Sequence, residues 1–214
     1  GMDQWILSAD ILQPFGSMDC DLFGAETRAS GLGDTTLATH LNTPYFIETG
    51  NMKYGMSAGL ILTAPTGEYH KEKKTVNLGA NRWSYEAELT PVIWHMGDMI
   101  FELTGSVTFY SDNDDYGVAS ERLETDPTYL LQGHLSYDVT DSFWVGASYY
   151  YKTGGENDLE NVCLNDEADD QKLRFTGAFM LSPQTQLLLQ YEKSLEVKNG
   201  IEQDYIGARF AYLF

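Results

Sequence analysis

His134 and Ser136 are the two residues whose types and spacing come nearest to a catalytic pair. Side chains alternate along a β-strand, so two positions apart the imidazole and the hydroxyl lie on the same face. A histidine can activate a serine hydroxyl for nucleophilic attack when the two lie within hydrogen-bond reach and a third group orients the histidine. The neighbouring residues put this pair on the polar face of a strand, and no asparagine that could orient the base is evident. We therefore interpret both residues as polar wall residues and keep a hydrolase as an alternative.

A second candidate is an acidic stretch that partly matches a calcium-binding loop. Asp112, Asp114 and Gly117 fit the pattern, but Tyr116 stands where a ligand oxygen is required and no glutamate follows at the twelfth position. The glycine-rich stretch at 31–36 precedes a strand pattern, whereas phosphate-binding loops open a helix. We predict no metal site and no cofactor, and we keep weak binding of divalent cations by acidic loops as a hypothesis.

The elements that position these residues are strands, because apolar and polar residues alternate along ten segments. Between 99 and 110, for example, Phe101 and Leu103 face one way while Glu102 and Thr104 face the other. No segment makes a convincing helix. The expected strands cover about 3–13, 34–42, 53–63, 81–96, 99–110, 129–139, 143–152, 172–181, 185–193 and 206–214.

The connections between these strands alternate between long and short. Long polar loops at one end and tight turns at the other are typical of an outer-membrane barrel. The long connections are about 14–33, 64–80, 111–127, 154–170 and 194–202, and the short ones are a turn around 43–52, Gly97-Asp98, Thr140-Asp141-Ser142 and Ser182-Pro183-Gln184. The sequence therefore predicts an all-β, antiparallel, up-and-down transmembrane β-barrel, with residues 1–214 as a single domain.

Composition excludes several other classes. The net charge of -19 argues against binding nucleic acid, because no basic surface could neutralise a phosphate backbone. The 14 tyrosines and 4 tryptophans suit the boundary between lipid and water. The two cysteines, Cys20 and Cys163, leave one disulfide or two free thiols open. The leading Gly1 resembles the scar of a cleaved expression tag.

The polar strand faces predict the lining of the barrel. Ten strands lie between eight-stranded barrels, which side chains fill, and the roughly 16-stranded porins, which hold a channel, so we expect a narrow lumen. Charges of both signs in a confined interior usually pair. A salt-bridged plug and a polar wall that guides a small solute are thus both open, with Glu102 and Arg174 the best candidates for lining a path. The predicted lumen-lining residues are Glu86, Glu88, Glu102, His134, Lys172, Arg174, Gln186, Gln190 and Arg209.

The C-terminal segment has an apolar face that we expect to contact outer-membrane lipid. Gly207, Phe210, Tyr212 and the terminal Phe214 resemble the signal by which the bacterial barrel-assembly machinery recognises its clients. We predict that these four residues form that signal.

Several stretches resemble the family named for the meta-pathway of phenol degradation, whose members are predicted outer-membrane barrels of proteobacteria. The matching stretches are GLGDTTLATHL (31–41), LTAPTGEY (62–69), NLGANRW (77–83), YSDNDDYG (110–117), DPTYLLQGHLSYDVT (126–140), GGE (154–156), SPQTQLLLQY (182–191) and EVKNG (196–200). Members of this family are longer at the N-terminus by roughly one hairpin. The chain thus resembles a truncated member, with ten of twelve expected strands, and its closure as a ten-stranded barrel is open.

The resemblance implies a non-enzymatic role linked to the catabolism of aromatic compounds. We therefore expect passage or capture of small hydrophobic or aromatic solutes in the outer membrane. The alternatives are a structural barrel with a plugged lumen and, second, an outer-membrane hydrolase.

Overall fold

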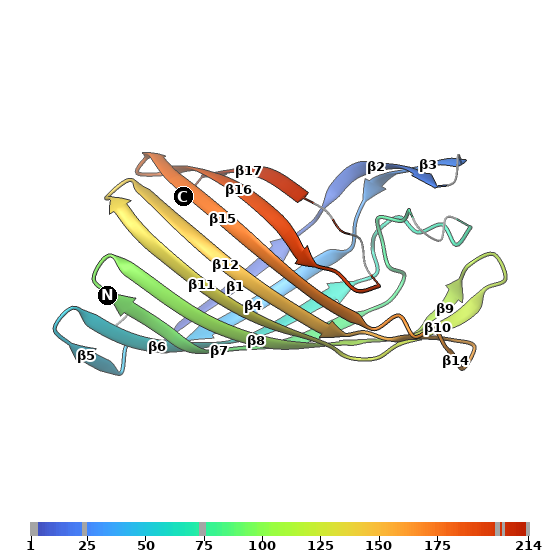
Figure 1. Ribbon diagram of the computed structural model, residues 1–214, viewed down its shortest axis with the longest axis horizontal. Coiled ribbons are helices and arrows are strands. Elements are labelled where there is room, and N and C mark those ends of the chain that lie inside the picture. Colours follow the sequence, from blue (N-terminus) through green and yellow to red (C-terminus); the bar gives the residue numbers. More distant parts are fainter. Residues whose placement is uncertain (1–3, 23–24, 73–75, 200–201, 203, 213–214) are drawn as a thin grey trace.

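The described part of the chain is built almost entirely from antiparallel strands. The structure, a computed structural model, describes residues 4–22, 25–72, 76–199, 202 and 204–212. Ten long strands form the main sheet (Figure 1): β1 (Ile6–Leu12), β4 (Thr35–Asn42), β6 (Met52–Ala64), β7 (Ser84–Met96), β8 (Met99–Tyr110), β11 (Thr128–Thr140), β12 (Phe143–Gly154), β15 (Ala168–Ser182), β16 (Thr185–Glu196) and β17 (Asp204–Tyr212). Each expected strand is present, so the all-β prediction is confirmed.

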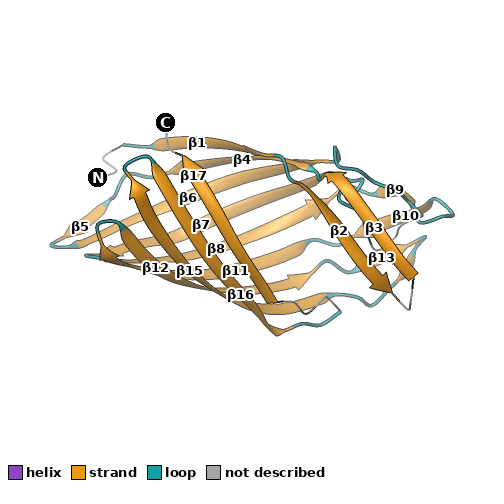
Figure 2. Cartoon of the chain, turned by 90° about the horizontal axis from the view of Figure 1, so that it is seen from above, coloured by secondary structure: helices purple, strands orange, loops and turns teal. Residues whose placement is uncertain are grey.

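Each of these strands pairs antiparallel with the next one in this order, which confirms the up-and-down topology. The sheet curves, and Figure 2 shows β6, β7 and β8 behind β12, β15 and β16. Within the described residues β1 pairs only with β4 and β17 only with β16, so the pairing order has two ends. No helix in the described ranges is long and apolar enough to cross a membrane.

The tight turns lie where the sequence predicts them. Gly97 adopts a φ of 67°, a left-handed conformation that glycine adopts without steric cost, and it joins β7 to β8 with Asp98. The connection around 43–52 differs from the expected plain turn, because it contains β5 (Ile47–Thr49), which pairs with the start of β6.

Three of the long connections are also more ordered than predicted. They contain the hairpin of β2 (Phe15–Leu22) and β3 (Ala25–Leu32) and a small sheet of β9 (Asn113–Tyr116), β10 (Glu121–Thr125), β13 (Asn157–Leu159) and β14 (Val162–Cys163). Alternation does not reveal β9 and β10, because most of their residues are polar. Asn113, which is 2% exposed, accepts a hydrogen bond of 2.8 Å from Asn81 Nδ2.

The two faces of the main sheet differ in exposure. One face carries buried side chains, and the other carries exposed apolar side chains. On the inner face Ser148 and Ala178 are almost fully buried. On the outer face Phe175, Leu131 and Phe210 are exposed, as expected for residues that contact lipid. The alternation read from the sequence therefore separates an interior face from an outer one.

Candidate functional site

All nine predicted lumen residues project from the interior face of the main sheet. One continuous row crosses five neighbouring strands, in which Glu102, His134, Ser148, Arg174 and Glu192 follow one another as register partners. The other six predicted residues lie on the same face, because their register partners alternate in step with this row. They are Glu86, Glu88, Lys172, Gln186, Gln190 and Arg209. Their contact with a solute stays a prediction.

His134 forms a hydrogen bond with Ser148, a residue that is not among the predicted lining residues. Its Nδ1 lies 2.7 Å from Ser148 Oγ on β12, and within the described residues no hydrogen bond joins it to Ser136. The register places Ser148 directly opposite the histidine, so the His134–Ser136 pair that the hydrolase alternative requires does not form within the described residues. Ser148 is only 3% exposed, so its oxygen is out of reach of a substrate. The contact thus ties β11 to β12.

A group of paired charges occupies the interior wall formed by β12, β15 and β16, which we call the basic wall. Arg174 Nε donates a hydrogen bond of 2.9 Å to Glu192 Oε2, and Lys172 Nζ lies 3.4 Å from Glu192 Oε1. Glu192 is 6% exposed, and a carboxylate is stable at such burial only when it is paired. The Arg174 guanidinium also lies over the Tyr150 ring, 4.8 Å from its centroid.

The facing wall, formed by β6, β7 and β8, carries Glu86, Glu88 and Glu102, and we call it the acidic wall. Glu88 Oε1 lies 3.6 Å from His40 Nε2. A Cβ at Gly59 would lie 2.7 Å from His40 Cδ2, so the absence of a side chain there lets the imidazole approach Glu88. Across the described residues neither Glu86 nor Glu102 forms an ion pair.

Apolar and aromatic side chains that are not among the nine predicted lining residues interrupt the polar lining. By register Ile93, Leu130, Trp144, Tyr150 and Leu188 lie on the interior face. A period-two pattern could have placed Leu130 and Leu188, since each lies an even number of positions from a predicted lining residue on its own strand. It could not have placed Ile93, which follows a bulge between Leu89 and Val92. The interior is therefore mixed in chemistry, with rings and aliphatic groups between the charges.

The larger hollows of the molecule lie on its outer face. A hollow of about 610 Å³ surrounds Gly105, lined mainly by outward residues such as Leu89, Val107, Tyr129 and Leu131. Because these side chains are on the lipid-facing surface, we assign this hollow to membrane contact and look for solute sites on the interior face.

The comparisons with known proteins decide the family. The model of the family described as "Putative MetA-pathway of phenol degradation" matches residues 1–210. The chain belongs to this family. The crystal structure of an outer membrane channel from Pseudomonas putida F1 is similar to it, with a TM-score of 0.89 and 30% sequence identity over 99% of this chain and 78% of that chain. The search of curated proteins found no match.

Membership of this family confirms the predicted relationship, the fold class and the outer-membrane location. The protein is homologous to an outer-membrane channel, which is a non-enzymatic class. The burial of Ser148 agrees with that class, because a nucleophile must be reachable.

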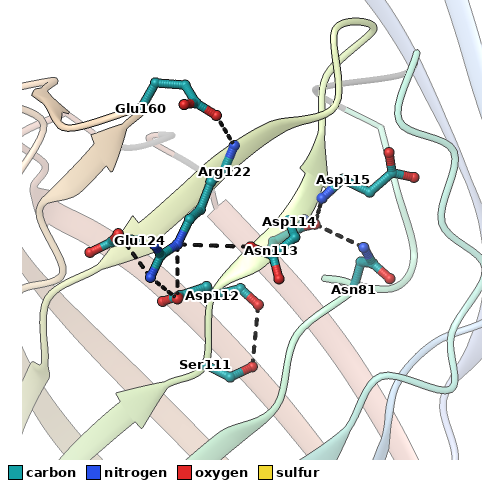
Figure 3. Close-up of polar contacts among 9 residues, drawn as sticks. All are labelled: Asn81, Ser111, Asp112, Asn113, Asp114, Asp115, Arg122, Glu124 and Glu160. Carbon is teal, nitrogen blue, oxygen red and sulfur yellow. Dashed lines mark hydrogen bonds and ion pairs between the residues drawn. The ribbon is translucent and has the colours of Figure 1, made fainter.

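At the end of the barrel that carries the long connections, an arginine occupies the acidic loop. Arg122 lies within ion-pair distance of Asp112 and Asp114, and 3.1 Å from Glu124, while its backbone N–H donates to Glu160 Oε1 (Figure 3). The hydrogen bond to Asp112 raises the pKa of Arg122 above its ordinary value. The guanidinium already supplies the positive charge here, and the described residues contain no metal-binding group of His, Cys, Asp or Glu. Arg122 therefore balances part of the negative charge of this loop, and weak binding of divalent cations by the acidic loops stays a hypothesis.

Cys163 is a free thiol, so the disulfide alternative is wrong. Its Sγ donates a hydrogen bond of 2.9 Å to Glu156 Oε1, and this contact raises the pKa of the thiol. The side chain of Cys20 lies outside the described residues.

The predicted assembly signal lies on both faces of β17. Phe210 and Tyr212 are exposed on the outer face, Gly207 lies on the interior face opposite Gln190, and Phe214 lies outside the described residues. Recognition by the barrel-assembly machinery stays a prediction.

Proposed function

We propose that this outer-membrane channel homologue lets small hydrophobic or aromatic solutes pass through, or be captured in, its interior. The observation that carries this proposal is the mixed lining, in which Leu130, Trp144 and Tyr150 share the interior face with charged residues. Binding sites for small organic molecules combine apolar and aromatic groups with a few polar ones that fix orientation. The description of the family, which refers to phenol degradation, agrees with such a solute.

A uniformly polar lining would favour sugars and ions. Apolar groups between the charges instead lower the cost of removing a ring from water, at about 25 cal/mol per Å² of apolar surface. We therefore expect the interior to discriminate between a ring and a sugar of the same size.

The test is uptake into proteoliposomes, with a phenolic solute and a sugar of similar size as the pair compared. Small phenols cross lipid unaided, so protein-free vesicles give the background, and benzoate, which is charged, serves as a slowly permeating aromatic. Aromatic flux above this background that exceeds sugar flux supports the proposal. Equal flux of both solutes contradicts aromatic selectivity.

A structural barrel with a plugged lumen is the second candidate, and the pairing of Glu192 with Lys172 and Arg174 favours it. Such pairs cross-link the neighbouring strands β15 and β16 on the interior face. Absence of protein-dependent flux for every solute would establish this candidate in place of the first.

A further inference from the structure

We propose that a cavity in the basic wall binds an aromatic carboxylate with a single ring. The ring lies beside Tyr150 and Leu130, and the carboxylate lies at Lys152 and Lys172. This inference rests on the proposed function and specifies the solute class for that same interior.

The cavity has a volume of about 220 Å³ and opens on the interior face between β11, β12, β15 and β16. Three cationic and two acidic side chains line it, so the lining has one positive charge in excess. A monoanion restores neutrality there, whereas a neutral solute leaves the excess charge uncompensated. The lining residues are Leu130, Tyr150, Lys152, Asp170, Lys172, Arg174 and Glu192.

The contacts within the cavity decide which cations are available. Arg174 is engaged twice, by Glu192 and by the face of Tyr150, so it fixes the position of the ring that lines the cavity. Lys172 lies 3.4 Å from Glu192, a long contact that leaves donors on its ammonium group. Lys152 forms no ion pair with any described residue. Two ammonium groups with spare donors therefore border the same cavity.

The size and the apolar part of the lining favour an aromatic ring over a simple anion. An apolar cavity of about 150 Å³ accepts benzene. The space of about 220 Å³ thus accommodates one ring with a carboxylate. Tyr150 offers a ring edge and Leu130 an aliphatic surface, and neither group gains from contact with a small hydrated anion such as acetate.

The position of the cavity supports capture of an anion. Lys152 and Asp170 lie where β12 ends and β15 begins, beside the long connection between these strands. The acidic wall lies across the interior, and Glu86 and Glu102 there carry charge without an ion pair within the described residues. Their field repels a carboxylate from one wall and favours it at the other.

The test measures binding to the purified full chain in detergent micelles by isothermal titration calorimetry. The probes are benzoate, benzyl alcohol, which has the ring without the charge, and acetate, which has the charge without the ring. Protein-free micelles give the partition background. We expect benzoate to bind at least about tenfold more tightly than either of the other probes, since one charge-assisted contact accounts for such a factor. Comparable affinity for all three, or no benzoate binding, overturns the proposal.

Two variants locate the site. Lys152→Gln removes the unpaired ammonium and should weaken benzoate binding about tenfold while leaving the weak benzyl alcohol signal unchanged. Lys193→Gln is the matched control, because Lys193 projects from the outer face of β16 opposite Leu173. Equal loss of benzoate binding in both variants would show that net charge, rather than the cavity, attracts the anion, and would overturn the site.

Flux separates this inference from the proposed function. If phenol flux is intact in proteoliposomes but benzoate does not bind, the proposed function stands and the carboxylate site is wrong. If no solute shows protein-dependent flux, the proposed function is wrong, and the binding data alone then decide whether the cavity captures the anion.

Discussion

The two walls of the interior differ in how their acidic residues are paired, although Glu88 on the acidic wall contacts His40. On the basic wall, Glu192 is almost fully buried and holds both Arg174 and Lys172. On the acidic wall, Glu86 and Glu102 have no ion pair within the described residues. Both walls arise from the same alternation of polar and apolar residues. Paired charges fasten strands together, whereas unpaired charges leave a field in the lumen that a solute experiences.

The largest effect on stability is expected from disrupting the buried contacts of Glu192 with Arg174 and Lys172. Glu192→Gln removes the carboxylate that neutralises two cations, and should lower the free energy of unfolding by about 2 kcal/mol. The matched variant Glu86→Gln removes a carboxylate without an ion pair, and should change that free energy by less than about 0.5 kcal/mol. Urea-induced unfolding of the lipid-reconstituted protein measures both.

The double variant Glu192→Gln with Arg174→Gln sharpens this comparison. Because the two residues share hydrogen bonds, their losses should be less than additive. Equal destabilisation by Glu192→Gln and Glu86→Gln would show that the two walls do not differ in the way their contacts indicate.

The next effect concerns the field of the acidic wall. Glu102→Gln removes an unpaired charge from the interior, and should lower the preference for cations over anions by about twofold, a few tenths of a kcal/mol in partly screened water. The reversal potential across a planar bilayer with a KCl gradient measures this ratio. Asp141→Asn, in the exposed turn between β11 and β12, is the control and should leave the ratio unchanged. An unchanged ratio in both variants would show that Glu102 does not face the conducting path.

The strands were predictable because their period of two is a local property of the sequence. The alternation of Phe101 and Leu103 with Glu102 and Thr104 fixes which face each side chain joins, and the structure has β8 over 99–110 as expected. The hairpin β9–β10 was missed because its residues are polar on both faces. Its stability comes from partners distant in sequence, such as the pairing of β10 with β13.

The candidate site was only half predictable for a related reason. The alternation of side chains along a strand shows which residues lie on the interior face. Which residue each of them contacts depends on the register between neighbouring strands, and turns and bulges set that register. His134 meets Ser148 rather than Ser136 because β12 pairs opposite it. Lys172 faces Ser194 in the regular register, yet its side chain reaches Glu192, which lies opposite Arg174. No local pattern contains this information.

The long connections also contain acids with and without a cation partner, and we expect changes there to have smaller effects. Asp115 is an acid with such a partner. Hydrogen bonds from Ser120 and Lys71 hold the pKa of Asp115 below its ordinary value. This contact therefore stabilises the loop above the ordinary carboxyl pKa, and the stabilisation is lost as the pH falls through the lowered pKa. The protection of backbone amides near residue 115, measured against the intrinsic exchange rate at the same pH, should fall in that acidic range, whereas Lys71→Met should lower it already at neutral pH. An unchanged exchange rate in Lys71→Met would show that the lysine contact contributes nothing.

The smallest expected effect is on the reactivity of Cys163, and it tests Glu156, which forms no ion pair with any residue that the structure describes. Cys163 donates to Glu156, and that carboxylate raises the pKa of the thiol, so less thiolate is present at a given pH. In a Cys20→Ser background, where Cys163 is the remaining thiol, the rate of alkylation should reach half its maximum at a higher pH than for free cysteine. Glu156→Gln should move that midpoint down, because the amide lacks the negative charge that disfavours the thiolate. A midpoint that Glu156→Gln leaves in place would therefore mean that solvent screens this loop, and that the unpaired acids matter only in the confined interior.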